Sequence, residues 1–184
     1  VFFVISGFLI TSIIYADIKN GKFSYVDFYT RRIKRLMPVF FTVLFCTLTA
    51  AYFLFTAHDL QDLAKSSRYA AFFASNFYFS AEQDYFSPNT YEMPLLHTWS
   101  LAVEEQFYFI WPIIVLGVLR FTPKLLLPIS FLLCIASFIL GSFLAIHHET
   151  SSWNCFHLPA RMGELLVGAL LALYKPQIRF PQLT

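Results

Sequence analysis

Residues 94–108 concentrate side chains that can hold or move a proton. The stretch contains His97, Ser100, Glu104 and Glu105. If it is helical, the first three lie on one face, because residues three and four positions apart share a helix face. An imidazole beside a carboxylate can then act as a general base. The alternative is a hydrated helix start whose N-terminus stabilises the two glutamates, and the residue types do not separate these interpretations.

A second pattern is a cluster of cations formed by Arg31, Arg32, Lys34 and Arg35, directly before an apolar run. Arg32 and Arg35 are about one helical turn apart, and two guanidinium groups so placed can bind the same phosphate. Such clusters are also common as topology signals and lipid-headgroup anchors next to membrane spans. The spacing by itself favours the topology signal.

The third pattern is Arg161 with Glu164, followed by Gly168. Residues three apart on a helix can form an ion pair, and a glycine one turn further allows a neighbouring helix to approach closely. From the residue types alone, an ion pair that holds two helices together is favoured over a reactive site.

No metal site is expected from this sequence. The candidate ligands near the C-terminal end lack the spacing of known metal motifs; they are His147, His148, Cys155 and His157. No GxSxG, Walker or HExxH motif and no dinucleotide fingerprint is present, so soluble hydrolases, nucleotidases and dehydrogenases have no support.

The elements that must position these residues are membrane-spanning helices. Of the 184 residues, 58% are hydrophobic and 13% are charged, against roughly 25% charged in soluble domains. Residues 36–57 and 125–146 carry no charge, and each run is long enough to cross a bilayer. Shorter apolar runs at 1–16, 101–119 and 156–174 bring the expected number of spans to about five.

The predicted fold class is therefore all-α, a polytopic transmembrane helix bundle. Residues 69–81 are apolar but too short to span, which predicts an interfacial or re-entrant helix. Ten of the 13 lysines and arginines fall in residues 17–35, 120–124 and 175–184. The positive-inside rule places these loops in the cytoplasm. The net charge of only +2 argues against a nucleic-acid partner.

Several motifs, in order along the chain, resemble those of the membrane-bound acyltransferase-3 family, which includes bacterial O-antigen and peptidoglycan O-acetyltransferases. The resemblance covers residues 1–174, and its most specific part is the string from His97 to Tyr108. The matching segments are Val1–Thr11, Phe28-Tyr29, Arg31–Pro38, Ser75-Asn76 and Leu95–Tyr108, followed by Arg161, Glu164 and Gly168.

The resemblance implies an integral enzyme of the bacterial inner membrane, which binds membrane lipid. It would transfer an acyl group, usually acetyl, from acetyl-CoA to a hydroxyl of a cell-envelope glycan or lipid-linked saccharide. The family's Arg-x-x-Arg element maps onto Arg32 and Arg35, which with Arg31 would bind the CoA phosphates. The residues that the resemblance makes candidates for catalysis are His97, Ser100, Glu104, Glu105, Arg161 and Glu164.

The best-known catalytic histidine of the family lies in the helix before the first one found here, together with an upstream arginine. We therefore expect residues 1–184 to be an internal part of one acyltransferase transmembrane domain, without its N-terminal helix and its C-terminal spans. We expect this part alone to be inactive. A non-catalytic transporter or regulator with the same fold is the alternative.

Overall fold

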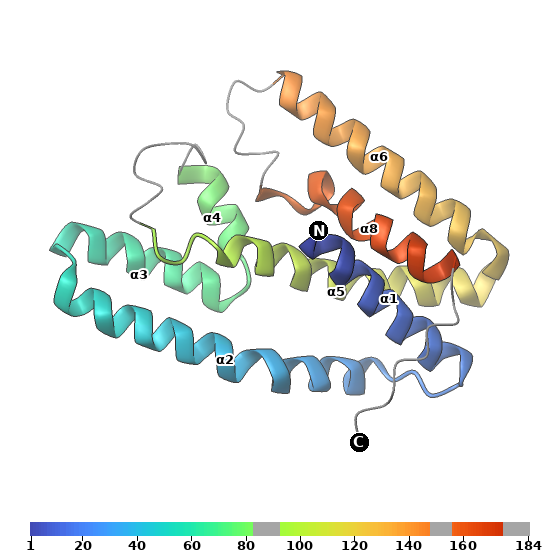
Figure 1. Ribbon diagram of the computed structural model, residues 1–184, viewed down its shortest axis with the longest axis horizontal. Coiled ribbons are helices and arrows are strands. Elements are labelled where there is room, and N and C mark those ends of the chain that lie inside the picture. The colour runs from blue at the N-terminus through green and yellow to red at the C-terminus, as the bar shows by residue number, and fades with distance from the viewer. Residues whose placement is uncertain (83–92, 148–155, 175–184) are drawn as a thin grey trace.

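The computed structural model describes residues 1–82, 93–147 and 156–174, and the regular structure in these ranges is entirely helical. The predicted all-α fold class is therefore confirmed (Figure 1). In chain order the elements are α1 (Phe2–Lys19), α2 (Tyr25–Leu54), α3 (Ala57–Ala71), α4 (Ser75–Glu82), α5 (Thr98–Phe121), the 3₁₀ turn η2 (Pro123–Leu125), α6 (Leu126–His147) and α8 (Leu158–Tyr174).

Four helical segments in the described ranges are long and apolar enough to cross a membrane: α1, α2, α5 and the segment Pro123–Ile146. The fifth expected span corresponds to α8, which has 17 residues and is about 26 Å long at 1.5 Å per residue. It is slightly shorter than the roughly 30 Å hydrocarbon core of a bilayer. The chain is a multi-pass membrane protein.

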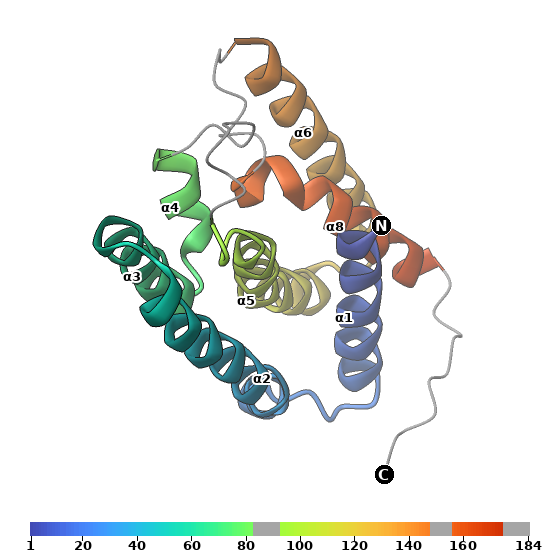
Figure 2. The same cartoon turned by 60° about the vertical axis from the view of Figure 1, so that its left-hand side comes forward.

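The helices surround α5, which lies at the centre when the structure is viewed nearly along this helix (Figure 2). The helices α1, α8 and α6 lie on one side of α5, and α2, α3 and α4 lie on the other. Residues Val103, Phe107, Trp111 and Val115 recur at every fourth position of α5 and are completely buried. This stripe forms the centre of the core, with Phe107 and Trp111 stacked at 5.4 Å between ring centroids.

Helix α8 packs between α1 and α6, and two glycines allow the close approach to α1. A Cβ atom on Gly7 would collide with the backbone carbonyl of Leu165, and one on Gly168 would collide with the backbone of Val4 and Phe8. The close packing expected at Gly168 is therefore present, and Gly7 lies on the other side of the same contact between α1 and α8.

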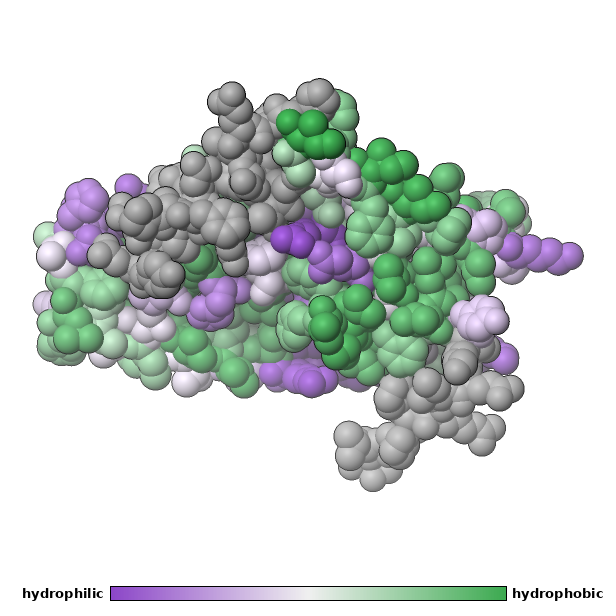
Figure 3. Space-filling view, turned by 45° about the horizontal axis from the view of Figure 1, so that its top comes forward, coloured by the Kyte–Doolittle hydropathy of each residue, from purple (hydrophilic) through white to green (hydrophobic). Residues whose placement is uncertain are grey.

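Hydrophobic side chains cover the outer surface of α6 (Figure 3). Phe131 is 55% exposed and Ile139 is 64% exposed, although both are large and apolar. A surface of this kind suits the hydrocarbon of a bilayer or a further membrane helix.

The predicted loop at residues 17–35 is wrong, because α1 continues to Lys19 and α2 begins at Tyr25. Ser24 provides the N-cap of α2, since its Oγ accepts a hydrogen bond from the backbone N–H of Asp27 at 3.3 Å. Asp27 adds a negative charge in the first turn, where the helix dipole favours one. The consequence for the site is that the cationic cluster lies on a helix and not in a loop.

The predicted single helix at 69–81 is also wrong, because α3 ends and α4 begins within it. Phe73 has a φ of 53°, and the N–H groups of Phe73 and Ala74 bond to the carbonyls of Ala70 and Tyr69 at 3.0 and 2.9 Å. This is the Schellman ending of a helix, in which the left-handed residue is usually glycine. A phenylalanine in that position carries no such signal in the sequence.

Candidate functional site

The candidate site is a group of polar side chains where α1, α2 and α5 meet. Helix α5 contributes Glu104 and Tyr108, one turn apart, and the Tyr108 hydroxyl donates a hydrogen bond to Glu104 Oε2 at 3.3 Å. Glu104 is only 4% exposed. Its second oxygen, Oε1, is buried and has no hydrogen-bond partner within the described part of the chain.

Helix α2 contributes Arg32, whose guanidinium carbon lies 3.8 Å from the centroid of the Tyr108 ring. The same carbon lies 5.8 Å from the centroid of the Phe28 ring, so the cation is placed between two aromatic faces. Its charge acts on the carboxylates of both Glu104 and Glu105. A direct ion pair with either carboxylate is not among those formed by the described residues.

Two further hydroxyl groups complete this group of side chains. Ser6 on α1 lies beside Glu104 and Tyr108. Tyr29 on α2 packs its ring against Phe109 at 6.0 Å, and its buried hydroxyl lacks a hydrogen-bond partner among the described residues. We call the following residues the polar cluster: Ser6, Tyr29, Arg32, Glu104, Glu105 and Tyr108.

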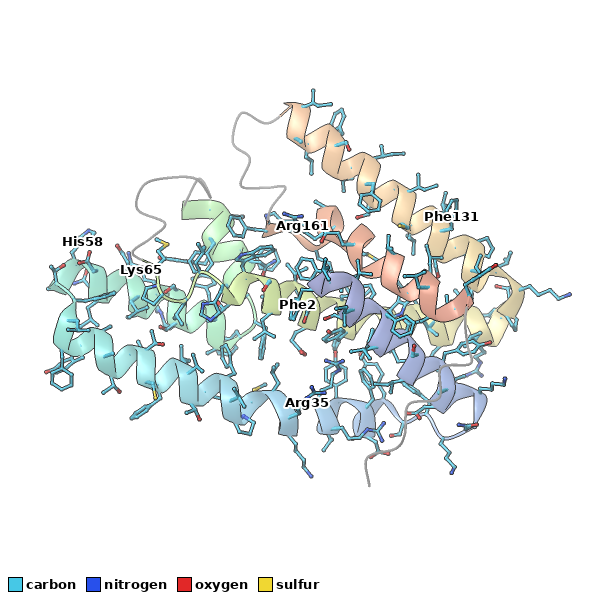
Figure 4. All side chains as sticks on the ribbon, in the orientation of Figure 1. Phe2, Arg35, His58, Lys65, Phe131 and Arg161 are labelled. Atoms are coloured by element: carbon cyan, nitrogen blue, oxygen red, sulfur yellow. The ribbon has the colours of Figure 1, made fainter. Side chains whose placement is uncertain are left out.

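The other cations of α2 are placed differently from Arg32. Arg31 pairs with Asp17 of α1 at 3.1 Å between Nη2 and Oδ2. Arg35 is exposed on α2 (Figure 4), and it forms no ion pair with another described residue. The three arginines predicted to bind a cofactor therefore have three different surroundings, and among the contacts of the described residues only that of Arg32 reaches α5.

His97 and Ser100 lie at the start of α5, outside the polar cluster. His97 is the N-cap residue and is exposed, while the Ser100 hydroxyl donates to the backbone carbonyl of His97 at 3.0 Å. The predicted helical face therefore begins only after His97, because residues 94–97 form a turn. The structure brings Glu104 together with Arg32 and Tyr108, and it gives no contact between Glu104 and the imidazole of His97 in the part it describes.

Arg161 and Glu164 form the expected ion pair, with 2.6 Å between Nη1 and Oε1. Both side chains are about one-third exposed, at 31% and 32%. The Arg161 guanidinium carbon lies 5.9 Å from the ring centroid of Trp99, which in turn packs edge-on against Phe3 at 6.0 Å. The pair therefore lies near the start of α5 and the N-terminal end of α1, where Figure 4 shows Arg161 and Phe2.

Ser6, Tyr29 and Tyr108 were not predicted as site residues. Tyr108 could have been found, because it lies one helical turn after Glu104 and carries a polar group in an apolar span. In the sequence, Ser6 is only a small residue next to Gly7 that suits helix packing. Tyr29 is one of many aromatic residues, and nothing in the sequence distinguishes it. Their proximity to the site depends on how α1 and α2 pack on α5.

No group of three potential metal ligands occurs within residues 1–82, 93–147 and 156–174. His148 and Cys155, two of the ligand candidates considered above, lie outside the described residues.

A bundle of apolar helices that holds a buried carboxylate near a half-buried arginine is an integral membrane protein with a polar site inside the bundle. The family described as an acyltransferase domain matches residues 1–184, the whole of the chain. The chain belongs to this family, acyltransferase-3.

Several curated proteins are similar to the chain. An uncharacterized protein of Haemophilus influenzae is 43% identical over 95% of this chain and 73% of its own length. O-acetyltransferase OatA of Staphylococcus aureus is 36% identical over 95% of this chain. YrhL of Bacillus subtilis, provisionally named a peptidoglycan O-acetyltransferase, is 35% identical over 97% of this chain. The chain spans only 29% of the length of OatA and of YrhL. No solved structure matches it.

Proposed function

We propose that the protein to which this chain belongs is a membrane O-acyltransferase that modifies a cell-envelope carbohydrate. In this proposal it transfers an acetyl group from acetyl-CoA to a carbohydrate hydroxyl, in the bacterial cytoplasmic membrane. Support for the reaction comes from family membership together with the names of OatA and YrhL, which match nearly the whole chain. Peptidoglycan, named for YrhL, is a glycan of the class proposed as acceptor.

The single observation that carries the proposal is the polar cluster around the buried carboxylate of Glu104. Glu104 lies in a span of a membrane protein and is 4% exposed, with Tyr108 and Arg32 beside it. Ionisable groups at membrane depth are costly, and they generally face a substrate pathway or a polar cavity. A carboxylate with a free oxygen can accept a hydrogen bond from a substrate hydroxyl or receive its proton.

The donor would bind on the cationic part of α2. The exposed arginines Arg31 and Arg35 can present guanidinium groups to the phosphates of CoA, which suits their bidentate geometry. This arrangement needs no metal ion and leaves the polar cluster for the chemistry of the acceptor.

The second end of the site would hold the carbohydrate. The Arg161–Glu164 pair beside the ring of Trp99 offers charged hydrogen-bonding groups and an aromatic face. His97 and Ser100 lie at the same end of α5 and are available to a ligand there.

The test uses the full-length protein in lipid nanodiscs, with acetyl-CoA labelled in the acetyl group and an envelope glycan as acceptor. Mass spectrometry of the glycan should detect a new O-acetyl ester with the wild type. Glu104→Gln should lower turnover by about 100-fold, the usual contribution of a proton-transferring group. The control Asp62→Asn changes a partly exposed carboxylate on α3 that pairs with Lys65, and it should leave turnover unchanged.

An acylated glycan that forms equally well with Glu104→Gln would contradict the role of the polar cluster. A wild-type protein that forms no ester but moves the glycan or the donor across the membrane would contradict the enzyme and favour a transporter. A wild-type protein that does neither would favour a regulator.

A further inference from the structure

Two buried polar atoms in the polar cluster lack the partners that buried polar atoms normally have. They are Glu104 Oε1, an acceptor, and the Tyr29 hydroxyl, which can both donate and accept. More than nine in ten buried polar groups in proteins are satisfied, because leaving one unpaired is costly. Of the two, Glu104 Oε1 belongs to the carboxylate bonded to Tyr108, whose ring lies under Arg32, and it indicates a position where a polar ligand can donate a hydrogen bond.

Arg32 is the common neighbour of these two groups. Its charge acts on Tyr29, on Glu104 and on Glu105, and its guanidinium lies against the ring of Tyr108. Arg35, about one helical turn further along α2, is exposed. The two arginines of the Arg-x-x-Arg element therefore differ in what surrounds them.

The charges around Arg32 decide which ligand fits. Glu104 and Glu105 both lie in its field, so two acidic side chains already compete with an incoming phosphate for the charge of Arg32. A neutral hydroxyl does not compete for this charge, and it can donate its hydrogen bond to Glu104 Oε1. A carbohydrate offers several hydroxyl groups of this kind.

We propose that the polar cluster is the subsite for the acceptor hydroxyl, and that Arg32 is a positioning residue of this subsite and not a phosphate ligand. The hydroxyl donates its hydrogen bond to Glu104 Oε1, while Arg32 holds Glu104 and Tyr108 in place across the contact between α2 and α5. Arg35 binds the phosphates of the CoA donor. This inference rests on the function proposed above, because it assigns the two substrates of that reaction to different arginines.

The experiment compares Arg32→Ala, Arg35→Ala and Glu104→Gln in the full-length protein in nanodiscs. Two quantities are measured for each variant: the equilibrium Kd of CoA, and the kinetic constants for acetyl transfer to a soluble oligosaccharide of the envelope glycan. Arg120→Ala, which removes an exposed cation at the end of α5, is the matched control and should behave as the wild type.

Glu104→Gln should lower kcat/KM for the oligosaccharide by about 10- to 100-fold, as expected when a hydrogen bond to a charged group is lost. Arg32→Ala should lower it by about 10-fold or more, because Tyr108 and Glu104 lose the contact that positions them. Neither change should alter the Kd of CoA by more than about twofold. Arg35→Ala should raise the Kd of CoA about tenfold or more, since a phosphate contact is removed. Arg32→Lys should recover only part of the activity, because an ammonium group lacks the planar face that lies on Tyr108.

If Arg32→Ala weakens CoA binding as much as Arg35→Ala does, the assignment of Arg32 is overturned while the acyltransferase reaction stands. A wild type that neither binds CoA nor forms the ester would contradict the proposed function itself. Misfolding of Arg32→Ala is recognised by loss of CoA binding together with a lowered melting temperature. In that case Tyr108→Phe, which keeps the ring under Arg32 and removes the bond to Glu104, must still lower kcat/KM for the oligosaccharide selectively, and an unchanged value would refute the subsite.

Discussion

The indole Nε1–H of Trp111 donates a hydrogen bond to Thr11 Oγ1 across 2.8 Å, and both side chains are completely buried. This bond joins α5 to α1, whose Ser6 lies beside the polar cluster. The relative position of the two helices is therefore set by a directional contact as well as by apolar packing. It follows that this contact also determines how the site is assembled.

Replacing Thr11 by Val should test this contact, because valine has a similar shape but cannot accept the hydrogen bond. We expect a loss of about 1–2 kcal/mol in the free energy of unfolding, the upper range for bonds between helices in membranes. The measurement is unfolding in mixed micelles followed by Trp fluorescence. Thr11→Ser keeps the hydroxyl and should lose less, and an equal loss in both variants would show that packing alone matters.

The close contact between α1 and α8 predicts a strong effect of one methyl group. Gly168→Ala would place a Cβ against the backbone of Val4 and Phe8, which cannot be relieved by a change of rotamer. We expect destabilisation of about 1–3 kcal/mol, as found for overpacked cores, or more if the helices separate. Gly117→Ala is the matched control, because nothing lies within 4 Å of its Cβ position, and it should be neutral or slightly stabilising in the same thermal unfolding assay.

At most helix positions alanine stabilises a protein more than glycine does, but the left-handed backbone conformation of Phe73 should reverse this order of stability. Both Phe73→Ala and Phe73→Gly lose the ring contact with Phe40, which has 5.3 Å between centroids. Only glycine adopts a φ of 53° without strain, so Phe73→Gly should be more stable than Phe73→Ala by about 1 kcal/mol. Thermal unfolding of the two variants side by side measures the difference, and a more stable alanine variant would contradict the backbone assignment.

His157 predicts a dependence of stability on pH. Burial lowers the pKa of this imidazole below its ordinary value of 6.5, and Ser80 Oγ lies 2.9 Å from its Nε2. As the pH falls, His157 therefore takes up a proton in the unfolded chain before it does so in the folded chain. The free energy of unfolding is thus highest above pH 6.5 and decreases below it. His157→Gln should reduce the decrease in melting temperature between about pH 7.5 and about pH 5.

The control for this prediction is His58→Gln. The His58 side chain is 85% exposed, so its replacement should leave the acid part of the stability curve largely unchanged. A His157→Gln curve that runs parallel to that of the wild type would show that other groups cause the decrease.

Part of the site could be predicted because its signals are local. Glu104 is recognisable as a candidate from a carboxylate inside an apolar run, and the Arg161–Glu164 ion pair from two opposite charges three residues apart. These local signals do not show what Glu104 or the Arg161–Glu164 ion pair does. His97 shows the limit of such reasoning, because a turn at residues 94–97 keeps it out of the helical face that its spacing suggested.

The sequence by itself determined the class of the protein and the identity of its membrane-spanning helices, since the length of an apolar run and its charges are properties of neighbouring residues. It also determined the family, through motifs that are read in order along the chain. Only the tertiary structure decided that Arg32 contacts Tyr108 while Arg35 remains exposed, and that Ser6 lies beside Glu104. These relationships join helices that are distant in the chain, and they depend on how α1 and α2 pack against α5, which no local pattern records.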